Sequence, residues 1–299
     1  MKKQAELTHL DKIYWPDEQI TKGELLEYYS QIAPYIIPYL KNRPLSLRRN
    51  PNGITEPGFF QKDAGDNIPD WIKTEEILAE STGKMVNYFI CNDLETLLYI
   101  ANMGCIEMNP WNSTINKLDN PDYIVMDIDP SDKNTFEDVV DVALVIKELL
   151  DQTGMTGFCK TSGSSGLHVY IPFGKKYTYD ESRDFAEILA TLVVERLPNL
   201  TTLERSLSKR KKDQIYVDFL QNRIAQTLAS AYSVRPKPGA TVSAPLEWSE
   251  VKHGLSPKDF TIKNMLKRVE EKGDLFKGVL GKGIDMQKAL QKMEALHED

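Results

Sequence analysis

A strand-like run that ends in two carboxylates constrains this chain more than any other feature of its sequence. The stretch DYIVMDIDPSD covers Asp122 to Asp132, and its apolar part is typical of a buried strand. Because successive side chains of a strand alternate between faces, we expect Asp127 and Asp129 on the same face. Two like charges in one small volume are costly unless a positive group, most commonly a divalent metal, lies between them. The alternative is that one of the carboxylates caps the next helix.

A third carboxylate occurs in the later segment QIYVDFLQN. Alternation in this segment places Asp218 on the face of Tyr216 and opposite to Val217. A buried Asp is rare without a partner, and three Asp residues from two neighbouring strands could hold two Mg²⁺ or Mn²⁺ ions about 4 Å apart. Such an arrangement serves phosphoryl and nucleotidyl transfer.

The glycine- and serine-rich segment KTSGSSGLH is predicted to be a turn between two strands and a grip for phosphate groups. It offers hydroxyl groups, backbone N–H groups and two cationic side chains, Lys160 and His168. Because side chains of a strand alternate, His168 and Tyr170 are expected on one face and Leu167 and Val169 on the other. The histidine would then face a polar site, opposite the apolar side chains. The segment is not a P-loop, because G-x-x-x-x-G-K-[ST] is absent. The alternative is a hairpin tip whose histidine is satisfied within the fold. The hydroxyl groups belong to Ser162, Ser164 and Ser165, and the N–H groups lie around Gly163 and Gly166.

The order of apolar patterns along the chain predicts a mixed α/β fold, with a mixed sheet as the core, flanking helices and an N-terminal lobe. A helix is expected in TKGELLEYYSQIAPYIIPYL until Pro34 and Pro38 interrupt it, and another is expected to end near Gly154. Neither repeats nor a flexible linker occur. Residues 1–299 are therefore expected to form one catalytic unit, with two lobes of about 1–110 and 111–299 packed together.

The charge balance limits the kinds of partner that the chain can have. A formal net charge of -7 argues against a protein coated in positive charge for non-specific binding of nucleic acid. Basic residues nevertheless gather in KNRPLSLRR and RSLSKRKK, where they could bind nucleic acid locally. The alternative is that these runs form a solvated surface or loop. We expect no membrane span, no signal peptide and a cytoplasmic location, and the three cysteines are expected to be buried thiols.

Four motifs together resemble a known family. DYIVMDIDPSD, KTSGSSGLHVYIP, IYVDFLQN and AYSVRPKPGATVSAPLEW are similar, in this order, to the polymerase domain of bacterial ligase D, within the archaeo-eukaryotic primase superfamily. The similarity runs from LTHLDKIYWP to the C-terminal helices, which is nearly the whole chain. It implies a primase-polymerase fold.

The resemblance also implies roles for individual residues. It makes the three Asp residues the metal ligands, for two Mn²⁺ or Mg²⁺ ions, and it assigns other residues to the nucleotide and to DNA. The carboxylates are Asp127, Asp129 and Asp218. The residues implied for the nucleotide are Ser162, His168, Lys211, Gln221 and Arg235, and those implied for DNA are Lys12, Lys22, Arg48, Phe59 and Phe60. The sequence departs from the family pattern at Asn109, Ser165 and Lys211, where the family often has His, Lys and Arg.

The activity implied is that of a template-dependent nucleotidyltransferase that adds nucleoside triphosphates, with a preference for ribonucleotides, to a 3′-hydroxyl. Its setting would be gap filling in non-homologous end joining, on nucleoid-associated DNA with a gap or end that bears a 5′-phosphate. A K-x-D-G adenylation motif does not occur, so a DNA ligase on another chain or domain and a Ku-type end-binding protein are the implied partners. Two alternatives remain open: a D-x-D phosphohydrolase or glycosyltransferase, and a degenerate nucleic-acid-binding module, which the three departures would suit.

Overall fold

The computed structural model describes residues 4–79, 82–206 and 208–298, which fall into two compact units. Each unit is assembled from three stretches of the chain. Unit 1 comprises Met1–Asn116, Thr227–Ala244 and Phe260–Gly273, and unit 2 comprises Lys117–Gln226, Pro245–Asp259 and Asp274–Asp299. Unit 1 thus takes in two segments that lie far beyond the boundary near residue 110. The prediction that both parts act as a single catalytic unit stays a prediction.

Unit 1 is built from small antiparallel sheets and helices. Its larger sheet has the strand order β4-β3-β7, and β1-β2 and β5-β6 are separate antiparallel pairs. The strands are β1 (Ile13–Trp15), β2 (Ile20–Thr21), β3 (Leu45–Arg49), β4 (Phe59–Gln61), β5 (Thr74–Ala79), β6 (Lys84–Phe89) and β7 (Cys105–Pro110), and the helices are α1 (Lys22–Leu40), α2 (Leu94–Asn102) and α5 (Met265–Lys272).

Helix α1 passes through both of its prolines, so the prediction that Pro34 and Pro38 interrupt it is wrong. The helix begins at a capping box, in which Thr21 accepts from the Glu24 backbone N–H and Glu24 accepts in return. Both prolines are exposed and four residues apart, so the helical hydrogen bonds they cannot make are lost on the solvent side. Buried side chains on the opposite side, such as Ile36, continue through the interruption and stabilise the helix.

Unit 2 is organised around one mixed sheet, in the order β11-β12-β8-β10-β9-β13. Strands β11 and β12 are parallel and the other neighbours are antiparallel, as the short link between β9 and β10 predicts. The strands are β8 (Tyr123–Asp129), β9 (Phe158–Thr161), β10 (Leu167–Pro172), β11 (Thr201–Thr202), β12 (Ile215–Asp218) and β13 (Pro245–Leu246). The helices are α3 (Phe136–Thr153), α4 (Tyr179–Arg196) and α6 (Met286–Glu298), with 3-10 turns η1 (Leu220–Asn222), η2 (Trp248–Glu250), η3 (Pro257–Asp259) and η4 (Lys277–Leu280).

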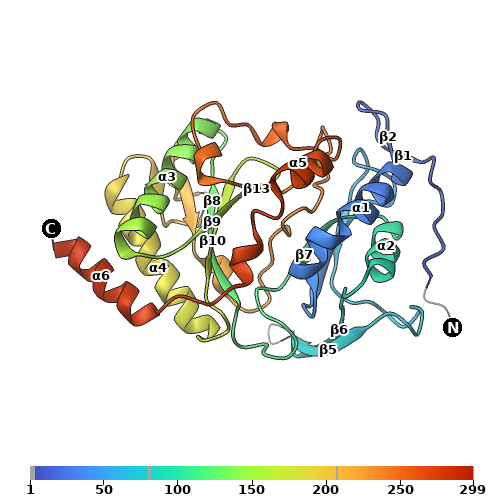
Figure 1. Cartoon of the computed structure of the whole chain (residues 1–299), viewed down its shortest axis with the longest axis horizontal. Helices are drawn as coiled ribbons and strands as arrows, with labels where there is room; N and C mark the ends of the chain where they lie inside the picture. The colour runs from blue at the N-terminus through green and yellow to red at the C-terminus, as the bar shows by residue number, and fades with distance from the viewer. Residues whose placement is uncertain (1–3, 80–81, 207, 299) are drawn as a thin grey trace. The chain divides into compact units, whose positions relative to one another are not determined.

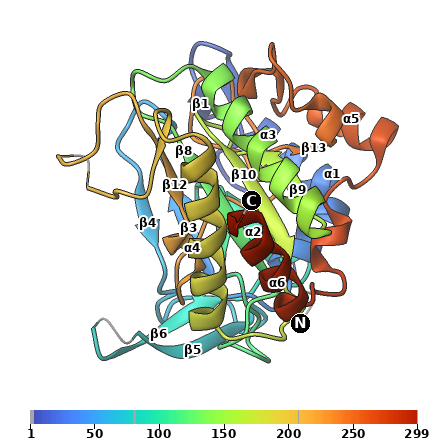
Figure 2. The same ribbon diagram turned by 90° about the vertical axis from the view of Figure 1, so that its left-hand side faces the viewer.

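The two faces of this sheet differ in character. One face carries apolar side chains such as Met126, Ile128 and Val169, all fully buried. Helices α3 and α4 pack against the sheet (Figure 1). Helix α6 lies against these two helices, as the turned view shows (Figure 2). Helix α3 ends at Gly154, which has a φ of 71°, as predicted. The opposite face is therefore the one that carries the polar side chains.

The remaining expectations about the interior are met where the structure describes them. Cys91, Cys105 and Cys159 are buried and free of disulfide bonds. Burial raises the pKa of the Cys159 thiol to about 12 and raises the pKa of the other two as well, so these thiols are unreactive. Within the described ranges, every helix is too short or too polar to cross a membrane.

Candidate active site

A row of polar residues crosses four neighbouring strands of unit 2. Asp218 of β12 is paired in register with Asp127 of β8, Asp127 with His168 of β10, and His168 with Lys160 of β9. Directly opposed residues on neighbouring strands share a face, so these four side chains lie side by side. Asp129, two residues beyond Asp127, is on the same face. The alternation predicted from the sequence is confirmed.

The carboxylates of the row repel one another. Burial raises the pKa of Asp218, and the charge of Asp127 raises it further. The pKa of Asp129 is also raised, first by burial and then by Asp127, while Arg210 acts in the opposite direction. Removal of negative charge, or arrival of positive charge, would relieve this cluster.

Neighbouring protein groups contact two of the carboxylates, Asp218 and Asp127. Asp218 accepts hydrogen bonds from the Tyr216 hydroxyl at 3.1 Å, the Leu220 backbone N–H at 2.7 Å and the Gln221 side-chain amide at 3.1 Å. The Nε2 atom of His168 lies 3.3 Å from Oδ1 of Asp127. Gln221, predicted near the nucleotide, therefore contacts a carboxylate of the row.

The donor set fits a hard divalent cation. It consists of carboxylate oxygens, the ligands that Mg²⁺ and Mn²⁺ prefer. Among the described residues, however, no three Asp, Glu, His or Cys side chains converge closely enough to form a metal cage. The metal-binding role of Asp127, Asp129 and Asp218 stays a prediction.

The basic segment before β12 reaches the carboxylates through Arg210. This residue is buried, its guanidinium lies 4.8 Å from the centre of the Tyr216 ring, and Nη1 is 3.9 Å from Oδ2 of Asp129. Lys211, the residue predicted to contact the nucleotide, is exposed. Arg210 therefore supplies the positive charge beside Asp129, and the role of Lys211 stays a prediction.

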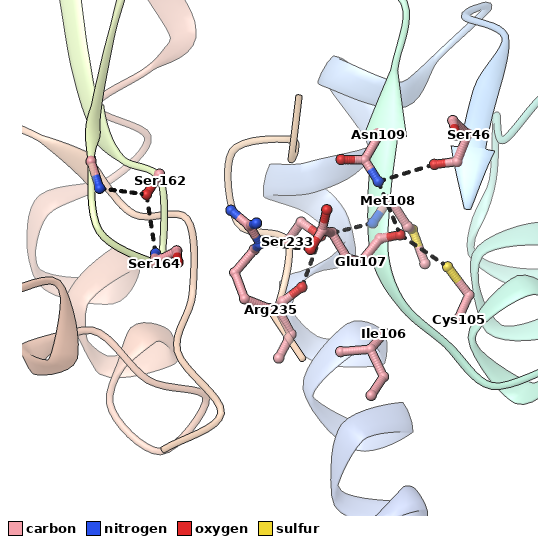
Figure 3. A network of polar contacts seen from close by, with 12 residues as sticks. Ser46, Cys105, Ile106, Glu107, Met108, Asn109, Ser162, Ser164, Ser233 and Arg235 are labelled. Atoms are coloured by element: carbon pink, nitrogen blue, oxygen red, sulfur yellow. Dashed lines mark hydrogen bonds and ion pairs between the residues drawn. The ribbon is translucent and has the colours of Figure 1, made fainter. Parts of the chain in front are cut away.

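The glycine- and serine-rich turn between β9 and β10 is organised by Ser162. Its Oγ accepts a hydrogen bond from the backbone N–H group of Ser164 at 3.1 Å (Figure 3). The same Oγ accepts from the backbone N–H group of Gly166 at 3.0 Å. A Cβ at Gly166 would lie 2.3 Å from the Ile128 carbonyl oxygen, so the approach of this turn to β8 requires glycine. Ser165 is exposed at the tip. The turn is thus held tightly against the strand that carries Asp127.

Arg235 lies in unit 1, where it pairs with a residue that the sequence reasoning missed. Its Nε donates to Oε2 of Glu107 at 2.6 Å, and Glu107 is buried in β7 (Figure 3). A single charged residue between the apolar Ile106 and Met108 was the available signal for Glu107. Asn109, two residues further, is buried and donates to the Ser46 carbonyl oxygen at 3.2 Å. Asn109 therefore has a structural contact within unit 1.

The aromatic and basic residues predicted for DNA also lie in unit 1. Phe59 and Phe60 are exposed by 47% and 59%, so both rings of edge strand β4, and not only one, face solvent. Arg48 and Arg49 of β3 lie over the rings of Phe60 and Phe59, at 5.1 and 5.3 Å from their centres. Core packing, the alternative for these rings, is thereby ruled out.

Two lysines lie close together near the start of α1. Lys22 is buried, and its Nζ donates to the Thr8 carbonyl oxygen at 2.7 Å, while Nζ of Lys12 donates to Asn52 at 2.6 Å. Burial lowers the pKa of Lys22, and the charge of Lys12 lowers it further. The two ammonium groups thus form a cluster of one sign, in contrast to the carboxylates of unit 2.

Comparison with known proteins decides the family. The model of the family described as LigD, primase-polymerase domain, matches residues 21–276. The chain belongs to the LigD primase-polymerase family. The resemblance stated from the sequence is therefore confirmed, as are the mixed α/β primase-polymerase fold and the class of enzyme, a nucleotidyltransferase of the polymerase and primase type.

Relatives in the LigD family are much longer than this chain. The "Bifunctional non-homologous end joining protein LigD" of Bacillus subtilis is 34% identical over 269 residues, which are 90% of this chain and 43% of the relative. The "Multifunctional non-homologous end joining protein LigD" of Mycolicibacterium smegmatis is 29% identical over 91% of this chain and 35% of its own length. The chain thus spans less than half the length of either relative.

A solved structure of the LigD family has the same fold. It is the "Polymerase Domain from Mycobacterium tuberculosis Ligase D in complex with DNA", with a TM-score of 0.87 and 25% sequence identity. The match covers 95% of this chain and 100% of that one. The two chains therefore share one fold over nearly their whole lengths.

Proposed function

We propose that this LigD-family chain is a template-dependent polymerase that adds nucleotides to a 3′-hydroxyl to fill gaps during non-homologous end joining. One observation carries the proposal: Asp127 and Asp218 are paired in register on neighbouring strands, with Asp129 two residues along the same face. Membership of the primase-polymerase family connects this arrangement of carboxylates with nucleotidyl transfer.

Asp127, Asp129 and Asp218 would hold Mg²⁺ or Mn²⁺, in a pair of sites. Bound ions supply two things to nucleotidyl transfer, a lowered pKa for the attacking hydroxyl and neutralisation of the leaving pyrophosphate. Burial and then the charge of Asp127 raise the pKa values of Asp129 and Asp218, and a bound cation would offset both effects, which supports this role.

The residues proposed to contact the incoming triphosphate are Ser162, His168, Gln221 and Lys211 of unit 2 and Arg235 of unit 1. Ser162 and His168 are fixed before substrate arrives, one by two backbone N–H groups and the other by its neighbours in the row. Arg235 is oriented by Glu107. Preorganised donors of this kind bind an anion with little loss of side-chain freedom.

DNA would contact the exposed surface of unit 1. Phe59 and Phe60 offer ring faces on which unpaired template bases can stack. Lys12, Lys22 and Arg48 would bind the 5′-phosphate at the far side of a gap, since a terminal phosphate carries more charge than a phosphodiester.

The cellular partners follow from the same proposal. The chain would use nucleoside triphosphates, with ribonucleotides preferred, and would act on nucleoid DNA in the cytoplasm. Joining of the filled ends would need a DNA ligase on another chain or domain and a Ku-type protein at the break. The end-joining names of the Bacillus and Mycolicibacterium relatives support this setting.

Primer extension tests the proposal. The substrate is a gapped duplex with a 5′-phosphate, supplied with Mn²⁺ and nucleoside triphosphates, and the variants are Asp127→Asn and Asp132→Asn. Asp132 is exposed in the loop after β8 and is the matched control. We expect extension by wild type and by Asp132→Asn, and a loss of about a thousandfold or more in the extension rate of Asp127→Asn.

Three other outcomes would count against the proposal. Extension by Asp127→Asn at the wild-type rate would contradict it. Phosphate release without extension would favour a phosphohydrolase, and DNA binding without either would favour a degenerate module.

A further inference from the structure

Lys160 is a fully buried lysine in the middle of β9, and the proposed nucleotide contacts do not include it. A buried ammonium group is costly unless it is paired and hydrogen-bonded. Its Nζ lies 2.9 Å from Nδ1 of His168 and 5.4 Å from the centre of the Tyr170 ring. The sheet register explains these contacts, since β10 places His168 directly opposite Lys160 and β8 places Asp127 on the other side of His168.

The chemistry of the two groups determines where the hydrogen of the imidazole lies. An ammonium group has three N–H donors and no acceptor, so the Nδ1 atom of His168 must accept. A ring nitrogen that accepts carries a lone pair and no hydrogen. The neutral ring therefore carries its hydrogen on Nε2, the atom that lies 3.3 Å from Oδ1 of Asp127.

We infer that Lys160 is a positioning residue that fixes the Nε2–H tautomer and the orientation of His168, so that this histidine presents a donor to the carboxylate side of the sheet. Without Lys160 the ring could carry its hydrogen on either nitrogen, and one of the two forms would present a lone pair to Asp127. Lone pair and carboxylate repel, so the ring would turn or exchange its hydrogen.

The consequence for the reaction rests on the proposed function. Phosphate oxygens are acceptors, so a triphosphate needs a donor from His168. The preset Nε2–H supplies that donor without the cost of selecting a tautomer when the nucleotide binds. Lys160 would thus act on the nucleotide through His168, by way of the contact between Nζ and Nδ1.

The first test measures the tautomer in the wild-type chain, before any substitution. Long-range ¹H–¹⁵N correlation spectra of ¹⁵N-histidine-labelled protein distinguish a ring nitrogen with a hydrogen from one without. The chain has only four histidines, so a His168→Gln spectrum assigns the signal. We expect Nε2 to carry the hydrogen and Nδ1 to carry none. A hydrogen on Nδ1, alone or together with Nε2, would overturn the inference.

The second test removes the donor with Lys160→Met, which has similar bulk, and uses Lys288→Met as a control because Lys288 is an exposed lysine of α6. In Lys160→Met we expect a mixture of tautomers and a rise on the order of tenfold in the apparent KM for nucleotide, with kcat and DNA affinity nearly unchanged. The control should match wild type in both respects. Two results would overturn the positioning role. One is a tautomer signal in Lys160→Met that matches wild type, and the other is a changed tautomer signal together with an unchanged KM for nucleotide. A third outcome separates the two proposals. If the wild-type chain shows the expected tautomer but extends no primer, the proposed function is refuted while the Lys160–His168 contact stays supported.

Discussion

The carboxylates of unit 2 and the lysines of unit 1 are like-charge clusters of opposite sign, and they are perturbed in the same way. Burial and then the charge of Asp127 raise the pKa of Asp129, and burial and then the charge of Lys12 lower the pKa of Lys22. In both clusters the protein therefore disfavours the charged form of a side chain that the proposed function requires to be charged. A ligand of the opposite sign would relieve each one.

The clusters differ in how the fold supports them. Asp127 and Asp218 lie on neighbouring strands whose register sets their spacing, and Arg210 lies beside Asp129. Lys22 is the first residue of α1, and its Nζ donates to the Thr8 carbonyl oxygen, which is a neutral acceptor. The acidic cluster is thus partly compensated by the positive charge of Arg210, whereas Lys22 has a neutral acceptor beside the repelling charge of Lys12.

The largest expected effect separates activity from stability in the acidic cluster. In Asp129→Asn, loss of a proposed metal ligand should lower primer extension about a thousandfold or more. The same change removes a repelling charge, so the thermal unfolding midpoint of the metal-free protein should stay equal or rise. Calorimetry and the gap-filling assay measure the two effects. A lower midpoint would mean that Arg210 outweighs the repulsion and would break the parallel between the clusters.

An intermediate effect is expected in the basic cluster. Wild type should bind a gapped duplex with a 5′-phosphate more tightly than one with a 5′-hydroxyl, and Lys22→Met should lose about tenfold of this preference. Because few phosphates are neutralised, the dependence of affinity on salt should correspond to about two to four counterions. Anisotropy titrations across a salt series give both quantities. The control is Lys41→Met, since Lys41 is exposed just after α1. Equal binding of the two duplexes by wild type would remove the basic cluster from the DNA site.

The smallest expected effect is the dependence of stability on pH. The pKa of Asp129 in the folded chain is raised above 3.8, so the folded state binds protons more tightly than the unfolded state. The contribution of this group to stability is therefore greatest below its unfolded pKa and falls as the pH rises through the folded pKa. The unfolding midpoint of metal-free wild type, relative to Asp129→Asn, should fall by about a degree or two from pH 4 to pH 7. Lys22 should show the reverse dependence in the alkaline range, because its folded pKa is lowered. A midpoint difference that is independent of pH would contradict the prediction.

Local patterns in the sequence were enough to predict which residues share a face. The period of two in β8, β10 and β12 predicted that Asp127, Asp129, His168 and Asp218 would lie opposite the apolar layer, and the register confirms it. Another local rule failed at α1. The rule that proline interrupts a helix predicted a break at Pro34 and Pro38, and the helix continues through both. Burial on the far side of the helix stabilises it through both prolines.

The sequence motifs were sufficient to predict the family, the fold class and the carboxylates that share a face, because these depend on residue type and on the spacing within each motif. The partners of these residues could be seen only in the folded chain. Glu107 and Arg235 are 128 residues apart, and Arg210 rather than Lys211 reaches Asp129, because the path of the chain before β12 turns one side chain inward and the next outward. Such pairings depend on how distant segments pack, and packing is a property of the whole unit that no local pattern contains.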